Sequence, residues 1–338
     1  MCALGASLAA LADAPMFVKD GKGPVPLQKT PAGVTHQSAQ ACGACHSEIV
    51  EEWRNTMHSS AWNDPHFQEL WRAQRKPAQC LNCHSPMAAQ QPLIGGKPNA
   101  AFEPTIQAEG VTCSACHVRD GHIVGRGTSV TKLPHPVKKD PSMGQSSYCA
   151  GCHQQAIAGR KKGLYDTFAE WQGSPQAKAG LTCQECHMPM RHGNVATGVF
   201  RPYRSHSFAG GHTDDMLKRA LTVTVQLDKP VYEPGDPISA VVRVKNTGAG
   251  HHVPSGDPLH QVRLVAGLAD GTGAFLERRE TVFARKMPRT PPYREHSDTR
   301  LAAGQERTIK LDLAYPGGLG EHYIIVQLSY HVIPPEVA

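Results

Sequence analysis

A Cys-x-x-Cys-His motif occurs five times in the first two-thirds of this 338-residue chain and takes ten of its eleven cysteines. Two thiols at this spacing can both form thioethers with the vinyl groups of one porphyrin. The histidine that follows them is then placed to bind the iron. The alternative, a set of redox or zinc Cys-x-x-Cys pairs followed by chance histidines, is disfavoured because the complete motif is repeated so often.

The motifs therefore predict five covalently attached c-type haems. The attachment residues are Cys42, Cys45, Cys80, Cys83, Cys113, Cys116, Cys149, Cys152, Cys183 and Cys186. The proximal iron ligands are His46, His84, His117, His153 and His187.

The composition fits a chain that builds part of its interior from porphyrin. Hydrophobic residues make up 40% of the chain and aromatic residues only 6%. We expect haem loading and folding to be coupled in the motif-bearing region, as metal binding and folding are in small metal-bound domains.

The formal charge of +6 falls to about +1 once haem propionates and ferric iron are counted. No large cluster of Lys or Arg occurs, and nucleic acid is disfavoured as a partner.

Thioether attachment to this motif is typical of exported proteins, and this predicts a periplasmic, extracellular or cell-surface location. Residues 1–14 are short, apolar and alanine-rich, with Ala10-Leu11-Ala12 as a cleavage site, and we interpret them as a signal peptide. Because a basic segment is missing there, we expect the true start to lie upstream. No later stretch approaches 18 apolar residues, so no membrane span is predicted.

The sequence predicts a multidomain chain. Residues 15–41 contain several prolines and are expected to form an extended arm. Residues 42–214 should form a haem-packed pentahaem cytochrome c domain of helices and loops. Residues 215–338 contain several short runs of alternating apolar and polar residues, separated by turn signals. That pattern predicts an all-β, immunoglobulin-like sandwich. The alternating runs are Leu221–Leu227, Ile238–Val244, Val262–Leu268, Ile309–Leu313 and Ile324–Tyr330.

A continuous helix is expected from His46 to His58, because Ile49, Trp53 and Met57 recur every fourth residue without Gly or Pro. The two histidines would then be roughly 18 Å apart along the axis. They could not bind one iron from opposite faces, so we expect His58 to serve a neighbouring haem.

Nineteen histidines less the five proximal ones leave fourteen for the distal iron positions. His58 is favoured because it follows a haem motif on the same helix. His206 and His212 flank a short loop after the last motif. His135 lies between two prolines, and His122, close behind the third motif, competes with it.

A further pair of adjacent histidines, His251 and His252, lies in a glycine-flanked loop between two predicted strands. Either of them could bind a haem iron of the other domain, and an exposed turn is the alternative.

Residues 42–212 resemble the multihaem cytochromes c related to the tetrahaem carrier that accepts electrons from hydroxylamine oxidoreductase. The matching pieces are Cys42–His46 with Glu52-Trp53, His58–Ala61, Gly110–His117, Phe168–Trp171 and Leu181–Pro189. The resemblance implies that a histidine in the position of His58 is a distal ligand of a different haem. A fifth haem departs from the tetrahaem pattern, so ligand pairs are not assigned by this likeness.

The tail resembles the β-domain appended to many multihaem cytochromes. Its matching pieces are Val231–Asp236, Asn246–His251 and Pro254–Gly256. In that pattern the histidine after the glycine is the recurrent one, and this favours His251 over His252.

The favoured function is an electron carrier, in which closely packed, mostly bis-histidine haems pass single electrons between a redox donor and an acceptor protein. Related cytochromes include filament-forming ones, so self-assembly into an extracellular conduit is a variant. The alternative is an oxidoreductase acting on a small nitrogen or sulfur compound at one open haem iron. Pentahaem nitrite reductases resemble the chain in haem count but carry lysine in one motif, whereas all five motifs here end in histidine. A structural surface protein with incidental haems is a third, weaker hypothesis.

Overall fold

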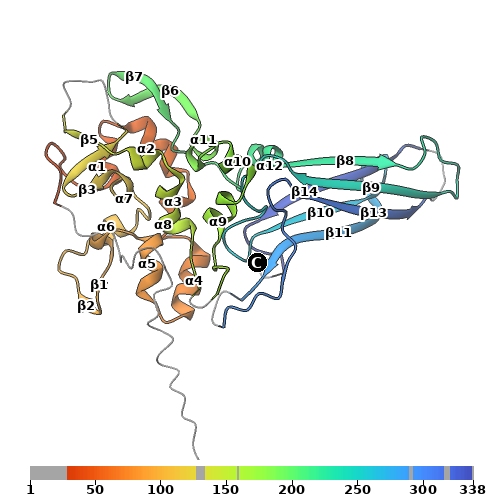
Figure 1. Ribbon diagram of the computed structural model, residues 1–338, viewed down its shortest axis with the longest axis horizontal. Helices are drawn as coiled ribbons and strands as arrows, with labels where there is room; N and C mark the ends of the chain where they lie inside the picture. The colour runs from red at the N-terminus through yellow and green to blue at the C-terminus, as the bar shows by residue number, and fades with distance from the viewer. Residues whose placement is uncertain (1–28, 127–133, 158–159, 289–291, 316–319, 337–338) are drawn as a thin grey trace, which may run out of the picture. The chain divides into compact units, whose positions relative to one another are not determined.

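The computed structural model describes residues 29–126, 134–157, 160–288, 292–315 and 320–336 (Figure 1). The predicted signal peptide 1–14 and most of the arm 15–41 lie outside these ranges. The chain divides into two compact units. The first holds the described residues up to Gly163 together with Thr182–Ala209, and the second holds Leu164–Leu181 with the described residues from Gly210. Residues 164–181 and 210–214 lie in the β-rich unit of this division, and the domain bounds 42–214 and 215–338 stay a prediction.

The first unit consists of short helices and three small sheets (Figure 1). Its helices include α1 (Ala39–Gly43), α2 (Ser47–Arg54), α3 (Met57–Ser60), α4 (Pro65–Ala73), α5 (Ala78–His84), α6 (Pro104–Gln107), α7 (Cys113–His117), α8 (Ala150–His153) and α11 (Cys183–His187), with 3-10 turns η2 (Ala88–Gln90), η3 (Pro141–Gly144) and η4 (Ser146–Tyr148). Its strands are β1 (Leu93–Ile94), β2 (Lys97–Pro98), β3 (Val118–Arg119), β4 (His122–Gly125), β5 (Val137–Lys139), β6 (Met190–Ala196) and β7 (Val199–Arg204).

The haem motifs share one local structure. Four of the five motifs lie on helices that end at the motif histidine, namely α5, α7, α8 and α11. In the first motif α1 ends at Gly43, and His46 is the residue that precedes α2. Each motif histidine is therefore held at a helix boundary, where it has a fixed relation to its two cysteines.

The continuous helix expected from His46 to His58 is wrong, because the chain breaks it at Thr56. The hydroxyl of Thr56 donates to Trp53 O (2.6 Å) and accepts from Ser59 N (3.3 Å), so it ends α2 and caps α3. Thr56 itself is extended, with φ −112° and ψ 161°. A side chain that bonds its own backbone in this way competes with helix continuation.

The second unit has two antiparallel sheets with strand orders β12-β11-β10-β14 and β13-β9-β8. Its elements are α9 (Thr167–Gln172), α10 (Pro175–Lys178), α12 (Asp214–Ala220), β8 (Leu221–Leu227), β9 (Pro237–Asn246), β10 (Gln261–Asp270), β11 (Phe275–Lys286), β12 (Ser297–Asp298), β13 (Glu306–Ala314) and β14 (His322–His331). Buried residues of both sheets form one core, which includes Val242, Leu264, Phe283 and Leu311, each no more than 1% exposed.

The five predicted alternating strands are confirmed as β8, β9, β10, β13 and β14. In β9 the inward residues Ala240, Val242 and Val244 are fully buried, while their neighbours are half-buried or exposed. The immunoglobulin-like topology stays a prediction. None of the helices in the described ranges has the length and apolar character needed to cross a membrane.

Candidate haem-binding sites

Three motif histidines each face a second histidine across a gap of the size of a metal ion. The ring centroids are 6.1 Å apart for His46–His135, 6.2 Å for His58–His153 and 6.1 Å for His117–His206. A metal–imidazole bond is about 2.0 Å and a ring nitrogen lies roughly 1.1 Å from the ring centroid, so an ion held between two imidazoles separates their centroids by about 6.2 Å. The observed pairs fit this distance.

All three second histidines were predicted as distal ligands from the sequence. His58, on α3, lies beside His153 of the fourth motif. His135 lies two residues before the strand β5, and His206 follows β7. The rings of the three pairs are inclined at 43°, 70° and 32°. Rotation about a metal–nitrogen bond leaves these angles free, so the neighbouring side chains must set them.

Four motif histidines have Nδ1 bonded to a backbone carbonyl. The pairs are His46 with Val195 O, His84 with Ala61 O at 2.7 Å, His117 with Val124 O at 2.9 Å and His187 with Ala209 O at 2.6 Å. Because a carbonyl can only accept, Nδ1 carries the proton and Nε2 is left with its lone pair. This is the arrangement in which a histidine is held for metal binding.

His135 is held by a close backbone approach rather than by such a hydrogen bond. Its Nδ1 is buried and has no hydrogen-bond partner among the described residues. The same is true of Nδ1 of His206. Gly33 adopts a left-handed conformation (φ 78°), and a Cβ there would lie 2.0 Å from Pro134 O and 3.0 Å from His135 Cα. Only glycine permits this approach, so Gly33 fixes where the backbone of His135 lies.

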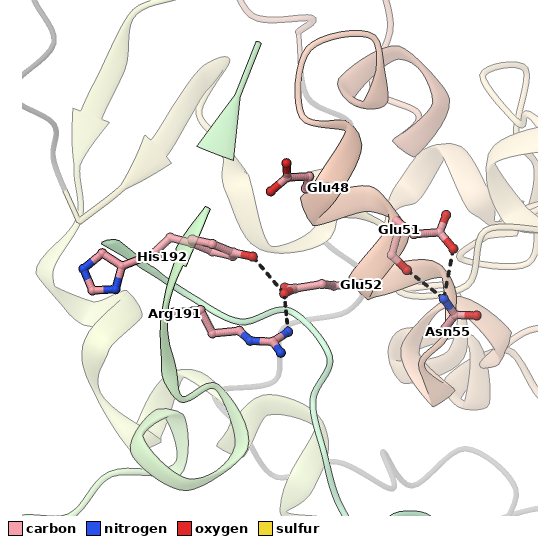
Figure 2. Close-up of a pocket in the computed structure, with 7 residues that line it drawn as sticks. Glu48, Glu51, Glu52, Asn55, Arg191 and His192 are labelled. Carbon is pink, nitrogen blue, oxygen red and sulfur yellow. Dashed lines mark hydrogen bonds and ion pairs between the residues drawn. The ribbon is translucent and has the colours of Figure 1, made fainter. Parts of the chain in front are cut away.

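Glu52 on α2 holds the backbone next to His206. Its carboxylate accepts hydrogen bonds from His206 N (2.6 Å), Tyr203 OH (2.8 Å) and Arg191 Nη1 (2.9 Å). Burial alone would raise the pKa of Glu52, but these hydrogen bonds outweigh it and lower the pKa. Figure 2 shows the carboxylate of Glu52 pointing from α2 toward Arg191 of β6, in a pocket that Glu48, Glu51 and Asn55 also line.

Cysteines of different motifs lie next to one another in the first unit. Hydrogen bonds join Cys42 to Cys113 and Cys149 to Cys183, and the former lowers the pKa of Cys42. The hydrogen bond that Cys83 donates to Cys152, together with burial, raises the pKa of Cys83. The first and third, second and fourth, and fourth and fifth motifs are thereby neighbours. None of the ten motif cysteines, all within the described ranges, forms a disulfide.

The second unit holds His251 and His252 in a loop that is fixed by buried polar groups. Nδ1 of His251 donates to His252 O (2.8 Å), so the proton is on Nδ1 and the lone pair on Nε2, as in the motif histidines. Asn246 Nδ2, fully buried, donates to His251 O (2.8 Å). The carboxylate of Glu170 accepts from His252 N (3.2 Å) and Ser255 Oγ (2.6 Å).

The remaining predicted ligands are placed differently. His122 is exposed on β4, and the same strand supplies Val124 O to His117. His212 is exposed in the turn before α12, in the second unit. Sequence analysis missed the roles of Glu52, Gly33 and Glu170, because each acts on a residue far along the chain.

Comparisons with known proteins agree with a haem protein. Residues 41–118, which include the first three motifs, match the family described as cytochrome c554 and c-prime. The fold is similar to that of a penta-haem cytochrome c552 from Thermochromatium tepidum, with a TM-score of 0.66 and 22% identity, over 91% of this chain and 94% of that one. These likenesses support a multihaem c-type cytochrome. The relation to the hydroxylamine oxidoreductase carrier stays a prediction.

One curated protein shares a local likeness. The mouse (Mus musculus) snRNA-activating protein complex subunit 3 is 38% identical over 71 residues, which are 21% of this chain. The chain spans 17% of the length of that relative.

Proposed function

We propose that this chain is a pentahaem c-type cytochrome that carries single electrons along a row of neighbouring haems. The observation that carries the proposal is the spacing of the three histidine pairs, with ring centroids 6.1–6.2 Å apart. Each pair joins a motif histidine to one remote in sequence. Such a pair would supply both protein ligands of one haem iron and would leave it no position for a substrate.

Each part of the proposed sites has a residue to supply it. The ten motif cysteines attach the porphyrins, and the five motif histidines are the proximal ligands. His58, His135 and His206 are the distal ligands of the fourth, first and third haems. When bound, each haem supplies an iron that alternates between the ferric and ferrous states and so holds one electron.

The haems attached at the second and fifth motifs, with His84 and His187 as proximal ligands, complete the proposed set of five. Both histidines have Nδ1 bonded to a carbonyl, so Nε2 is oriented as a ligand in the same way as in His117. His212 and His251 remain proposed distal ligands, without assignment to a particular haem. His251 is preferred to His252 because its Nδ1 donates to a carbonyl, which places the lone pair on Nε2.

The neighbouring cysteines support transfer between haems within the first unit. Cysteines that contact one another, as Cys42 does Cys113 and Cys149 does Cys183, attach porphyrins that must themselves be neighbours. Short distances between cofactors, and graded potentials set by burial and hydrogen bonds, favour electron transfer over catalysis at one iron. The proposal also includes redox donor and acceptor proteins, export to the periplasm or cell surface, and self-assembly into a conduit.

The test is electron paramagnetic resonance of the oxidised, haem-loaded protein, combined with carbon monoxide binding to the reduced form. The haem-to-protein ratio is measured first, and five are expected. Low-spin signals alone and no carbon monoxide adduct would support a carrier. A high-spin ferric signal with one haem that binds carbon monoxide would contradict it and favour an oxidoreductase with an open iron.

A further inference from the structure

The five residues Ser205–Ala209, which follow β7, contact the motif histidines of two haem motifs and the histidine that pairs with a third. His206 pairs with His117 of the third motif. The ring of Phe208 lies 4.4 Å from that of His58, the partner of the fourth motif. The carbonyl of Ala209 accepts from Nδ1 of His187 in the fifth motif. One short segment is thus in contact with the ligand sets of three haems.

Phe208 is the residue of this segment that touches two proposed distal ligands at once. Its ring meets His58 edge-to-face, with centroids 4.4 Å apart and planes at 77°. It meets His206 at 5.9 Å and 85°. Both geometries are those in which aromatic rings attract through their edges and faces. A ring held against both imidazoles restricts their rotation about a bond to iron.

The backbone of Phe208 is strained where this contact is made. Its φ is +44°, a conformation that bulky residues rarely adopt. The neighbouring hydrogen bonds hold the segment in place, since Ser207 N donates to Ser205 Oγ (3.2 Å) and His206 N donates to Glu52 Oε2 (2.6 Å). Strain of this kind persists only when the surrounding structure over-determines it, and it concentrates at functional sites.

We propose that Phe208 is a positioning residue that fixes the imidazole planes of His58 and His206 and thereby tunes the third and fourth haems together. This rests on the proposed function, because it takes both histidines as iron ligands. The angle of an axial imidazole, and the groups packed around it, affect the electronic state and reduction potential of the iron. A single side chain would then couple two neighbouring haems of the row.

Four variants separate the ring from the backbone. Phe208→Leu removes the aromatic ring and keeps an apolar side chain, and Phe208→Gly removes it without the left-handed backbone penalty. Phe208→Tyr keeps the ring and serves as the conservative variant. Phe200→Leu is the matched control, because Phe200 is 68% exposed on β7 in the same unit. Haem content is measured first, followed by low-temperature electron paramagnetic resonance and a spectroelectrochemical titration.

We expect two of the low-spin signals, and two of the midpoint potentials, to shift in Phe208→Leu and in Phe208→Gly. The signal assigned to the His46–His135 pair should stay unchanged, and Phe208→Tyr and Phe200→Leu should match the wild type. Unchanged spectra in both ring-free variants would overturn the proposal. Equal shifts of all five haems, or loss of haem loading in both variants, would also overturn it, because Phe208 would then serve folding in general. Failure of the proposed function is recognised separately, since the wild-type protein itself would lack bis-histidine low-spin signals.

Discussion

Glu170 Oε1 lies 2.8 Å from Arg300 Nη1 within the second unit, and their side chains are only 6% and 5% exposed. Glu170 belongs to α9, which precedes the last haem motif, whereas Arg300 follows β12. Arg300 also pairs with Asp298 at 2.8 Å. This buried pair ties α9 to the β-sheets, and it explains why residues 164–181 belong to the second unit rather than to the haem-binding one.

Breaking the pair should destabilise the second unit. Replacing Glu170 by Gln leaves Arg300 with Asp298 alone, and removing one partner of a buried ion pair costs about 3 kcal/mol. The free energy of unfolding, followed by the far-ultraviolet signal of the β-sheets in denaturant, measures the loss. Glu306→Gln is the control, because the Glu306 side chain is 42% exposed and lies 3.8 Å from Arg243. A control that loses as much as Glu170→Gln would contradict the expectation, since exposed pairs contribute about 0–1 kcal/mol.

The same pair predicts a pH dependence. Burial alone would raise the pKa of Glu170, but hydrogen bonding to His252 and the charge of Arg300 lower it from 4.5 to about 2. Since the folded pKa lies below the unfolded one, the stabilisation is complete above about pH 4.5 and is lost as the pH falls toward 2. The difference in unfolding free energy between wild type and Glu170→Gln, measured from pH 6 to pH 3, should therefore shrink with falling pH. A difference that does not change with pH would show that the carboxylate charge is not responsible.

The choice between His135 and His122 is open to a direct test. His135 lies 6.1 Å from His46 between ring centroids, whereas His122 is exposed on β4. His135→Ala should therefore leave one haem without its sixth ligand, giving a high-spin ferric signal and a carbon monoxide adduct on reduction. His122→Ala should keep the wild-type spectra. The reverse result would show that His122 is the ligand.

How much the sequence could predict depends on the range over which each signal acts. The strands of the second unit follow from alternation, which is local, and β11 was missed because its charged run Glu277–Glu280 hides the pattern. The break of the expected helix at Thr56 was missed because a side chain that bonds its own backbone leaves periodicity intact. His58, His135 and His206 could be proposed as ligands from chain position. Their partners could not, because the pairing depends on which motifs the tertiary fold brings together.

Two neighbouring carboxylates on α2 should behave very differently. Glu52 is 13% exposed and accepts hydrogen bonds from His206 N, Tyr203 and Arg191, whereas Glu51 is 62% exposed and pairs only with Arg54 and Asn55. Glu52→Gln should cost about 2 kcal/mol of unfolding free energy, since it weakens several hydrogen bonds to a charged acceptor. It should also shift the low-spin signal of the haem that we propose His206 to bind. Glu51→Gln should change the free energy by less than about 0.5 kcal/mol. Similar losses in the two variants would contradict a specific role for Glu52.

Gly33 should be intolerant of even one methyl group. A Cβ at this position would lie 2.0 Å from Pro134 O, so Gly33→Ala must displace the backbone that carries His135. Gly95→Ala is the matched control, because Gly95 is also left-handed (φ 57°) but a Cβ there would meet no atom within 4 Å. The control should lose only about 1 kcal/mol of unfolding free energy, from the left-handed conformation itself. Gly33→Ala should lose more and also alter the low-spin signal of the haem that we propose His46 to bind. If the two variants lost the same free energy and kept the same spectra, the close approach of Gly33 would have no part in holding the ligand.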